Sequence, residues 1–315
     1  MAELSLLLPA LARIQAAGTP AVLRRWLARG DGLPDAKPGR EAALRDCFEF
    51  AGTTLATAAL TRDLDCHDAC GALWLRADPA YAMADAVTVR LLACGTVDLS
   101  HEESNELARA LRPLFGDAGF PLEPATPARW YLRCPIDARL PLFAAPVDVL
   151  GDDLMRHLPQ GENQRQWRHL LNEAQVILHN HPVNAQRAQH GQMPANSLWF
   201  WGAGKLPEIV RSPFTRVFSN DDVAIALARV AKVASAAPES FDAFHIETND
   251  TLLLDLTDVR DGAALERSWL DPLDAMLRHS ALNAVHLRFV AGERTTIKPA
   301  HRWRFWRKIK AVPAR

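Results

Sequence analysis

Cysteine, long hydrophobic runs and an excess of either charge are all scarce in this chain of 315 residues. The five cysteines are odd in number, so at least one is unpaired, and we expect no secreted disulfide framework. The first apolar run covers only residues 4–8, ends at Pro9 and has no basic residue before it, unlike a signal peptide. No stretch approaches the ~20 consecutive apolar residues of a membrane-spanning helix. We therefore predict a cytoplasmic protein without a transmembrane segment.

The charges balance overall but not along the chain. Lys and Arg number 36 against 37 Asp and Glu, a formal net charge of −1. Residues 301–315 hold six basic residues and no acid, so the other 300 residues carry 30 basic against 37 acidic, a net charge of −7. A protein coated in positive charge for nucleic acid is excluded. A mildly acidic body ends instead in a basic tail.

The tail has two interpretations. Its first part alternates arginines with Trp303, Phe305 and Trp306, which favours a final strand with Trp303 and Phe305 packed inward. Residues 307–315 would then be a free basic extension. The alternative is contact with an anionic membrane or a nucleic acid, in which the arginines meet phosphates and the aromatic rings lie at the interface or stack on bases.

Strands and helices alternate along most of the chain. Short apolar runs predict strands at 4–8, 197–201, 215–218, 252–256 and 284–290. Helical periodicity predicts helices at 11–28, 41–60, 164–178, 222–233 and 263–278. Strands separated by helices of this length indicate an α/β layered core with a mostly parallel sheet.

Residues 72–134 read as a small α+β unit of their own. Strands are predicted at 72–76, 86–92 and 129–133, and a helix at 102–115 that begins with a capping box of Ser100 and Glu103. Because core-like segments lie on both sides, we predict an α/β core of residues 1–71 and 135–315 interrupted by an insertion at 72–134.

Polar amides, an arginine and glycines are concentrated between residues 179 and 207. Gly202 and Gly204 follow the strand predicted at 197–201 and would let the backbone approach a ligand closely. A third glycine is missing and Pro207 interrupts the helix start, so a dinucleotide fingerprint is not predicted. Asn184, Arg187 and Asn196 either contact a ligand or close hydrogen bonds around an irregular loop. Trp199 and Trp201 on the strand complete the set of ligand-binding candidates.

No motif of an enzyme active site or metal centre is complete. Cys66, His67, Asp68 and Cys70 lie close together, but the second ligand pair of a structural zinc site is missing. His179 and His181 are two residues apart and would not share a helix face, and they are interpreted as capping the helix end. Nucleophile-elbow, Walker A and His-Glu-x-x-His motifs are all absent. We predict no catalytic residue, no bound metal and no cofactor.

The segment from Pro182 to Pro207 resembles the RpfE-type bacterial regulatory proteins, themselves distantly similar to archaeal-type cofactor-independent phosphoglycerate mutases of the alkaline phosphatase superfamily. The matching residues are Pro182 to Arg187, Gly191, Pro194 to Gly204 and Leu206-Pro207, supported by Leu75 to Pro79, Arg129 to Leu132, His157 to Gly161 and Trp303 to Trp306.

The mutase kinship implies an alkaline-phosphatase-like core with an inserted domain, and also two divalent metals, a serine nucleophile and phosphoryl transfer. The mutases end their first strand with a metal-binding aspartate, but residues 4–8 here run into Pro9. Their Gly-His pair corresponds to Asp258 to Gly262, which lacks histidine, and their Asp-His-Gly corresponds to Ala291 to Arg294. The fold is expected without the metal centre.

The leading hypothesis is a non-catalytic regulatory protein, a pseudoenzyme on a degenerate mutase-like scaffold, that binds a small phosphorylated or acidic metabolite or a protein partner near Asn184, Arg187 and Asn196. One alternative is a phosphatase or phosphomutase with a rearranged site, with Ser197, Thr53 or Thr54 as nucleophile. Another is a membrane- or nucleic-acid-associated regulator that acts through its basic tail.

Overall fold

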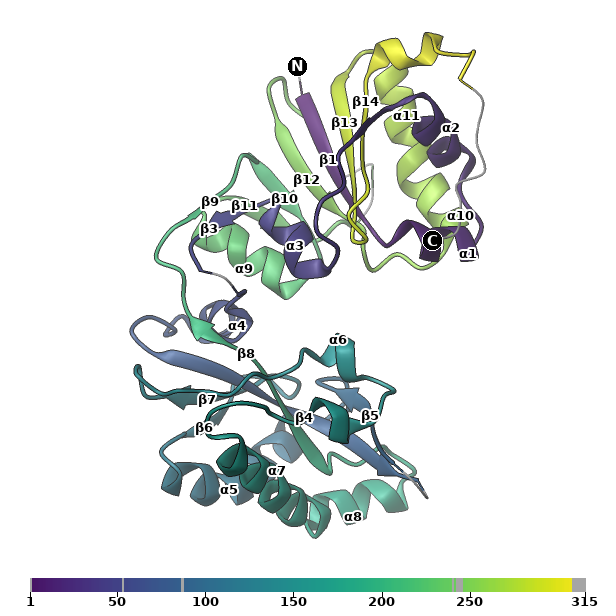
Figure 1. The fold of residues 1–315 in the computed structure, drawn as a ribbon. Helices are drawn as coiled ribbons and strands as arrows, with labels where there is room; N and C mark the ends of the chain where they lie inside the picture. The colour runs from purple at the N-terminus through teal and green to yellow at the C-terminus, as the bar shows by residue number, and fades with distance from the viewer. Residues whose placement is uncertain (1, 53, 86–87, 240, 242–245, 308–315) are drawn as a thin grey trace. The chain divides into compact units, whose positions relative to one another are not determined.

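The computed structural model describes residues 2–52, 54–85, 88–239, 241 and 246–307. Contacts between residues divide the chain into two compact units. Unit 1 consists of Met1–Ala51 and Glu208–Arg315, and unit 2 of Gly52–Pro207 (Figure 1).

The core of unit 1 is a seven-stranded sheet. Its strands are β1 (Ala2–Leu8), β2 (Asp31–Leu33), β10 (Arg216–Phe218), β11 (Ala234–Ala236), β12 (Thr251–Asp255), β13 (Leu282–Phe289) and β14 (Arg294–Ile297). The strand order is β11-β10-β12-β1-β13-β14-β2, and the five strands from β11 to β13 are parallel. Strands β14 and β2 pair antiparallel at one edge. The predicted α/β class with a mostly parallel sheet is confirmed.

Strand β1 lies in the middle of this sheet because its side chains are apolar on both faces. Leu4, Leu6, Leu7 and Leu8 are all fully buried, as expected for a parallel strand covered on both sides. Its neighbours β12 and β13 are also rich in buried leucine and valine. The strands predicted at 4–8, 215–218, 252–256 and 284–290 therefore form close to the predicted bounds.

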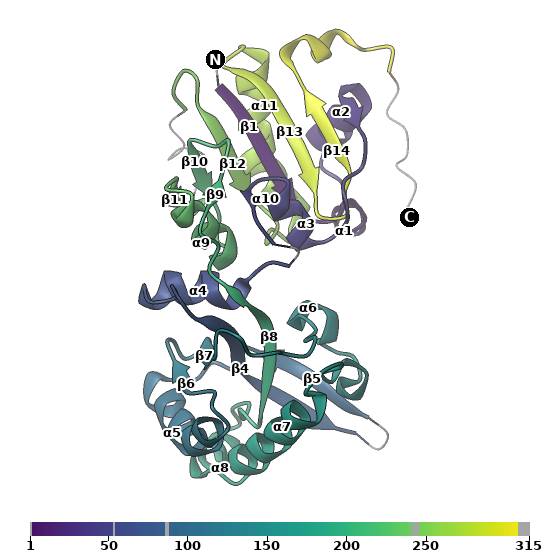
Figure 2. The same ribbon diagram turned by 60° about the vertical axis from the view of Figure 1, so that its left-hand side comes forward.

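Helices flank the sheet of unit 1 in both views (Figures 1 and 2). They are α1 (Leu11–Ala16), α2 (Ala21–Arg29), α3 (Arg40–Arg45), α9 (Asp222–Val230), α10 (Gly262–Leu265), the π-helical η3 (Glu266–Leu270), α11 (Asp271–Arg278) and the 3-10 helix η4 (Pro299–Trp303). Trp26 on α2 and Leu273 on α11 belong to the same buried core as β1.

The helix predicted at 41–60 is wrong. Helix α3 ends at Arg45, because Cys47 and Phe48 turn into the interior with exposures of 1% and 2%. Residues 49–50 then form strand β3 (Glu49–Phe50), which pairs with β9 (Val210–Arg211). Helix α4 (Thr57–Cys66) begins only afterwards, in unit 2.

Unit 2 contains a mostly antiparallel sheet. Its strands are β4 (Leu73–Ala84), β5 (Val89–Cys94), β6 (Leu122–Pro124), β7 (Trp130–Cys134) and β8 (Ser197–Lys205). The long β4 pairs with β5, β7 and β8, and β6 pairs with β7. Strand β8 continues through Gly202 and Gly204, so the prediction that these glycines end the strand is wrong.

Helices cover both faces of this second sheet. Besides α4 they are α5 (His101–Asp117), α6 (Pro146–Val149), the 3-10 helix η1 (Leu154–His157), α7 (Gln164–His179) and α8 (Pro182–Gln189). Helices α5 and α7 pack on one face around the fully buried Trp167, while α4 packs on the other beside Trp74. The predicted capping box is confirmed: Glu103 donates its backbone N–H to Ser100 Oγ, and Ser100 N–H donates to Glu103.

Residues 72–134 lie within unit 2, which also includes 52–71 and 135–207. The pairing of β8 with β4 joins the chain after residue 134 to this sheet. The predicted boundaries at 72 and 134 therefore do not coincide with the limits of the compact units, and the division into domains stays a prediction.

The predicted final strand in the tail is wrong. Lys298 is followed by Pro299, which is well placed at the start of a helical turn, and residues 299–303 form η4. Trp303 and Phe305 are 63% and 75% exposed instead of packed inward. The predicted basic extension from residue 308 onward lies outside the described residues.

Candidate functional site

A cluster of polar side chains lies where the parallel strands of unit 1 end. Strand β12 ends at Asp255, and Ser219 follows the neighbouring strand β10. Ser219 Oγ donates a 2.7 Å hydrogen bond to Asp255 Oδ2. Thr257 donates to the other carboxylate oxygen, Oδ1, from its hydroxyl at 2.7 Å and from its backbone N–H at 3.2 Å. In open α/β sheets this carboxyl edge is where ligands usually bind.

Arg40, the first residue of α3, completes this group. Its guanidinium donates to both oxygens of Asp255, at 2.5 and 3.2 Å, and to Thr257 Oγ1 at 3.1 Å. A second carboxylate, Asp221, lies 3.2 Å from Nη2. We call Arg40, Ser219, Asp221, Asp255 and Thr257 the carboxyl-edge cluster.

Asp255 is held ionised inside the protein. Burial alone would raise the pKa of this carboxyl group, which is only 3% exposed. The charge of Arg40 and hydrogen bonds from Arg40, Ser219 and Thr257 outweigh burial and lower the pKa below its ordinary value. Asp221 is more open, at 32% exposure of its side chain, and also caps α9 by accepting the N–H of Ala224.

Cys47 lies close to this cluster and is not a reactive thiol. The side chain is 1% exposed, and burial raises its pKa to about 12. Thiolate, not thiol, is the nucleophile, so Cys47 is inert near neutral pH.

Asn184 and Arg187, the first predicted ligand-binding residues, are buried in unit 2 and bonded within the chain. Asn184 donates to the carbonyls of Leu178 and Ala195 and accepts the N–H of Ala195. Arg187 is 2% exposed. Its guanidinium donates to the carbonyls of Val97, Asp98 and Met193 and to the Glu103 carboxylate.

Asn196 is different because it borders a hollow. Its amide exchanges two hydrogen bonds with the backbone of Ala82, at 2.8 and 2.9 Å. The hollow has a volume of about 410 Å³ and is lined by amide-bearing residues and a histidine: Asn172, Gln175, Asn180, Asn196 and His179. Among the described residues that line it there is no Lys or Arg to neutralise a phosphate.

Trp199 and Trp201 use their indole N–H groups inside the protein. Trp199 donates to the carbonyl of Ala144, and Trp201 donates to Asp78 Oδ2 at 2.7 Å. Asp78 also receives two 2.8 Å bonds from Arg76, and both are almost fully buried on β4. The Arg76 guanidinium lies 5.1 Å from the ring centre of Trp201.

Gly202 and Gly204 provide space for α4. A Cβ atom on Gly204 would lie 2.4 Å from Ala56 Cβ, and one on Gly202 would lie 2.9 Å from Thr57 Cβ. Gly202 also has a φ of +67°, which a side chain would strain. Both glycines are explained by helix–strand packing, and their predicted ligand contact stays a prediction.

The other sequence candidates are free thiols, helix caps or buried residues. Cys66 and Cys70 are exposed free thiols, and His67 forms the C-cap of α4 with a positive φ. His179 is the last residue of α7, but His181 is the N-cap of the next helix, α8, and accepts the N–H of Val183, so the prediction that His181 caps the C-terminal end of a helix is wrong. Ser197 is fully buried and accepts a hydrogen bond from Gln175, so a substrate cannot reach it. Thr53 lies outside the described residues.

The curated proteins described here that resemble parts of this chain are both phosphoglycerate mutases. A stretch of 116 residues is 32% identical to a probable 2,3-bisphosphoglycerate-independent phosphoglycerate mutase of Geobacter sulfurreducens, covering 35% of this chain and 28% of that protein. A stretch of 63 residues is 38% identical to the 2,3-bisphosphoglycerate-independent phosphoglycerate mutase of Methanosarcina mazei, covering 20% of this chain and 16% of the relative. This chain is distantly similar to the cofactor-independent phosphoglycerate mutases. No family model matches it.

Two solved structures show a weaker likeness. The cofactor-independent phosphoglycerate mutase of Thermoplasma acidophilum has a TM-score of 0.42 at 16% identity, covering 95% of this chain and 89% of that one. The PH0037 protein of Pyrococcus horikoshii has a TM-score of 0.45 at 14% identity, covering 93% and 86%. Both scores are below 0.5.

The carboxyl edge does not fit the divalent metals that the mutase kinship implies. Both oxygens of Asp255 are occupied by a guanidinium and two hydroxyls, and a cation placed there would lie against the positive charge of Arg40. Within the described ranges, no three His, Cys, Asp or Glu side chains gather as they would around a metal ion.

Sequence reasoning missed Arg40, Ser219 and Asp255. Arg40 and Asp255 are 215 residues apart, and nothing local marks either as part of a site. The available signal was weak: polar residues come directly after the predicted strands 215–218 and 252–256, at the edge where parallel strands end together.

Proposed function

We propose that this protein is a non-catalytic ligand-binding protein with a regulatory role, on a scaffold related to the cofactor-independent phosphoglycerate mutases. The observation that carries the proposal is Asp255. This aspartate ends a central parallel strand, yet both of its oxygens are bonded to Arg40, Ser219 and Thr257 and are not free for a metal. RpfE-type membership, on the motif between Pro182 and Pro207, belongs to the same proposal.

The ligand we propose is a small phosphorylated or acidic metabolite at the carboxyl-edge cluster. The Arg40 side chain is 26% exposed. Its Nη2 atom lies 3.2 Å from Asp221 Oδ2 but only 2.5 Å from Asp255 Oδ2, so the contact with Asp221 is the looser one. A phosphate or carboxylate can take the place of Asp221 while Asp255 keeps the guanidinium in position, since guanidinium groups bind such anions in bidentate fashion. Asn184 and Arg187 support this less well because their donors already have partners.

Thermal shift measurements with a panel of phosphorylated acids test the proposal. A ligand at one hundred times its Kd stabilises the native state by about 2.7 kcal/mol and raises the melting temperature. The shift should persist in chelator and disappear in Arg40→Met. The matched control, Arg211→Met, changes an exposed arginine of the same unit and should keep the shift. A shift that survives Arg40→Met would place the ligand elsewhere, and chelator-sensitive hydrolysis or isomerisation of the ligand would overturn the non-catalytic proposal.

A further inference from the structure

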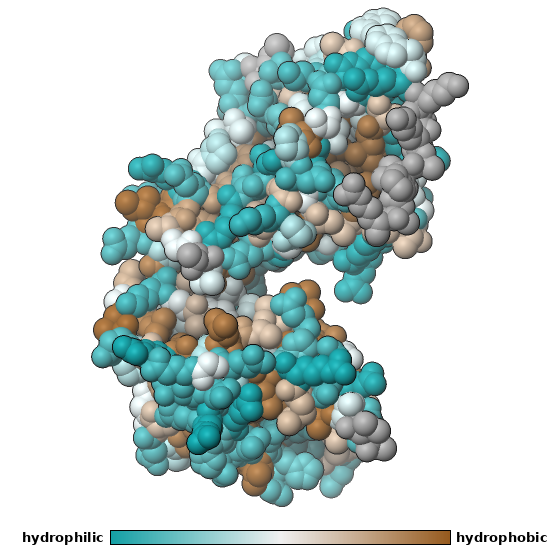
Figure 3. Space-filling model, viewed as in Figure 1, coloured by the Kyte–Doolittle hydropathy of each residue, from teal (hydrophilic) through white to brown (hydrophobic). Residues whose placement is uncertain are grey.

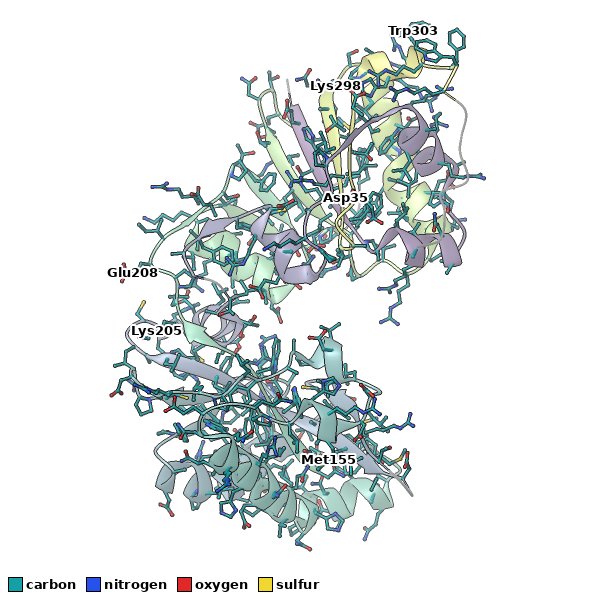
Figure 4. The ribbon with its side chains drawn as sticks, viewed as in Figure 1. Asp35, Met155, Lys205, Glu208, Lys298 and Trp303 are labelled. Atoms are coloured by element: carbon teal, nitrogen blue, oxygen red, sulfur yellow. The ribbon has the colours of Figure 1, made fainter. Side chains whose placement is uncertain are left out.

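Three large aromatic side chains are exposed within four residues at the C-terminal end of the described chain. Trp303, Phe305 and Trp306 are 63%, 75% and 66% exposed. Elsewhere, the face drawn in Figure 3 is mostly hydrophilic with hydrophobic residues scattered among hydrophilic ones. Figure 4 shows Trp303 at the end of unit 1 that carries η4, extending away from the sheet. Exposed apolar side chains in such a group indicate an interaction surface.

The surroundings of these rings are strongly basic. Residues 298–307 contain Lys298, Arg302, Arg304 and Arg307 and no acidic residue. Beside them lies a cavity of about 320 Å³, bordered by Lys298 and Arg302. Arginines 25, 29 and 278 also line the cavity, against a single carboxylate, Asp274. Arg25 and Arg278 pair with that carboxylate, and Arg304 pairs with Asp31 outside the cavity. Arg29 and Arg302 donate only to backbone carbonyls in the hydrogen bonds observed, so their positive charge is not neutralised there.

The arrangement of the rings decides which anionic partner fits. The Arg302 guanidinium lies over the Trp303 ring at 5.0 Å, and Phe305 and Trp306 meet edge to face with centroids 5.5 Å apart. Base stacking in single-stranded nucleic acid needs open ring faces along a groove, and these faces are partly covered. Tryptophan and phenylalanine beside arginine are typical of side chains that enter the headgroup region of a bilayer.

We propose that Trp303, Phe305 and Trp306, with Lys298 and Arg302, form a docking surface for an anionic lipid membrane. The aromatic rings lie among the headgroups, and the basic side chains and the cavity meet lipid phosphates. The aromatic rings and the basic side chains act together, because either type of membrane contact alone binds a protein to a membrane only weakly. This surface is independent of the carboxyl-edge cluster.

Vesicle sedimentation of the full chain tests this proposal. The protein should bind vesicles of phosphatidylcholine mixed with phosphatidylserine, bind pure phosphatidylcholine weakly, and dissociate as salt rises. The double variant Phe305→Ala, Trp306→Ala keeps every charge and should bind about tenfold more weakly. Ile209→Ala, at another exposed apolar residue of unit 1, is the matched control and should bind as the unaltered protein does.

Tryptophan emission gives a second readout that folding defects do not mimic. Trp303 and Trp306 are highly exposed, so anionic vesicles should shift their emission to shorter wavelength and protect it from a soluble quencher. The double variant Trp303→Phe, Trp306→Phe should still sediment with vesicles but lose the shift. Absence of binding to anionic vesicles would overturn the proposal. So would unchanged binding of the alanine variant, which would mean adsorption by charge alone, or displacement from vesicles by single-stranded DNA.

Discussion

At the scale of single residues, Asp255 organises the edge of the sheet in unit 1. A buried carboxylate is costly unless it is paired and hydrogen-bonded, and Asp255 has Arg40, Ser219 and Thr257 as partners. Removing one partner of a buried ion pair leaves the other charge uncompensated, which destabilises far more than the pair itself stabilises.

Arg40→Met should therefore lower the free energy of unfolding substantially. We expect a loss of about 3 kcal/mol, at the lower end of the range for buried pairs because the arginine is partly exposed. Denaturant unfolding measures it. Glu41→Gln, which breaks the neighbouring exposed pair with Arg45, should cost less than about 0.5 kcal/mol. Equal losses in the two variants would mean that the buried pair has no special role.

The same aspartate should make stability depend on pH in acid. Its pKa in the folded protein is below the unfolded value, so its contribution is complete above the unfolded pKa of about 4 and is lost as pH falls through the folded pKa. The urea concentration at the unfolding midpoint should decrease as the pH is lowered below about 4. Asp255→Asn should make this dependence of the midpoint on pH less steep. Asp137→Asn, at an exposed loop residue, should leave it unchanged. An identical slope in all three proteins would contradict the assignment.

Predictions for single residues were correct where the interacting residues are close together in the sequence. Ser100 and Glu103 are three residues apart and cap α5 as predicted. For Asn184, Arg187 and Asn196, the sequence left open ligand contact and hydrogen bonding around a loop. Asn184 and Arg187 bond to carbonyls around that loop, whereas Asn196 bonds to Ala82 on β4, and ligand contact stays a prediction. Arg40 and Asp255 could not be found in this way, because their contact depends on how distant strands and helices come together.

At the scale of elements, the contact between α4 and β8 explains two glycines. Periodicity predicted a strand at 197–201, but nothing local could show that it continues past Gly202. There α4 lies against the strand backbone, although its first residue, Thr57, comes 145 residues before Gly202 in the sequence. The same limit applies to the helix predicted at 41–60, which is interrupted because β3 pairs with the distant β9. Short-range sequence patterns indicate which secondary structure a segment prefers. They do not indicate which distant segment packs against it and changes that structure.

Gly204→Ala should destabilise the protein because the new Cβ would overlap Ala56. Overpacking of this kind costs about 1–3 kcal/mol. Gly116→Ala is the opposite case: Gly116 lies in α5 with open space around it, and alanine there should stabilise by about 0.5–1 kcal/mol. Thermal and urea unfolding of both variants measure the contrast. A neutral Gly204→Ala would show that α4 and β8 pack less closely than described.

At the scale of the whole molecule, the alternation of strands and helices was enough to predict an α/β fold with a mostly parallel sheet. The compact units begin and end at residues 51/52 and 207/208, which sequence patterns alone did not indicate. Among the residues the structure describes, no helix is long and apolar enough to cross a membrane. The curated relatives match over 28% of their length or less in the cases described, so their activity is carried to this chain only as a proposal.

The most direct test of the central claim is phosphorus NMR of 3-phosphoglycerate mixed with the full chain and zinc, a diamagnetic divalent ion, with and without chelator. A non-catalytic protein that binds acidic ligands through Arg40 should broaden the 3-phosphoglycerate resonance equally in both conditions. It should lose that effect in Arg40→Met and produce no new resonance. Appearance of a 2-phosphoglycerate or inorganic phosphate resonance that requires the metal and disappears with chelator would contradict the account.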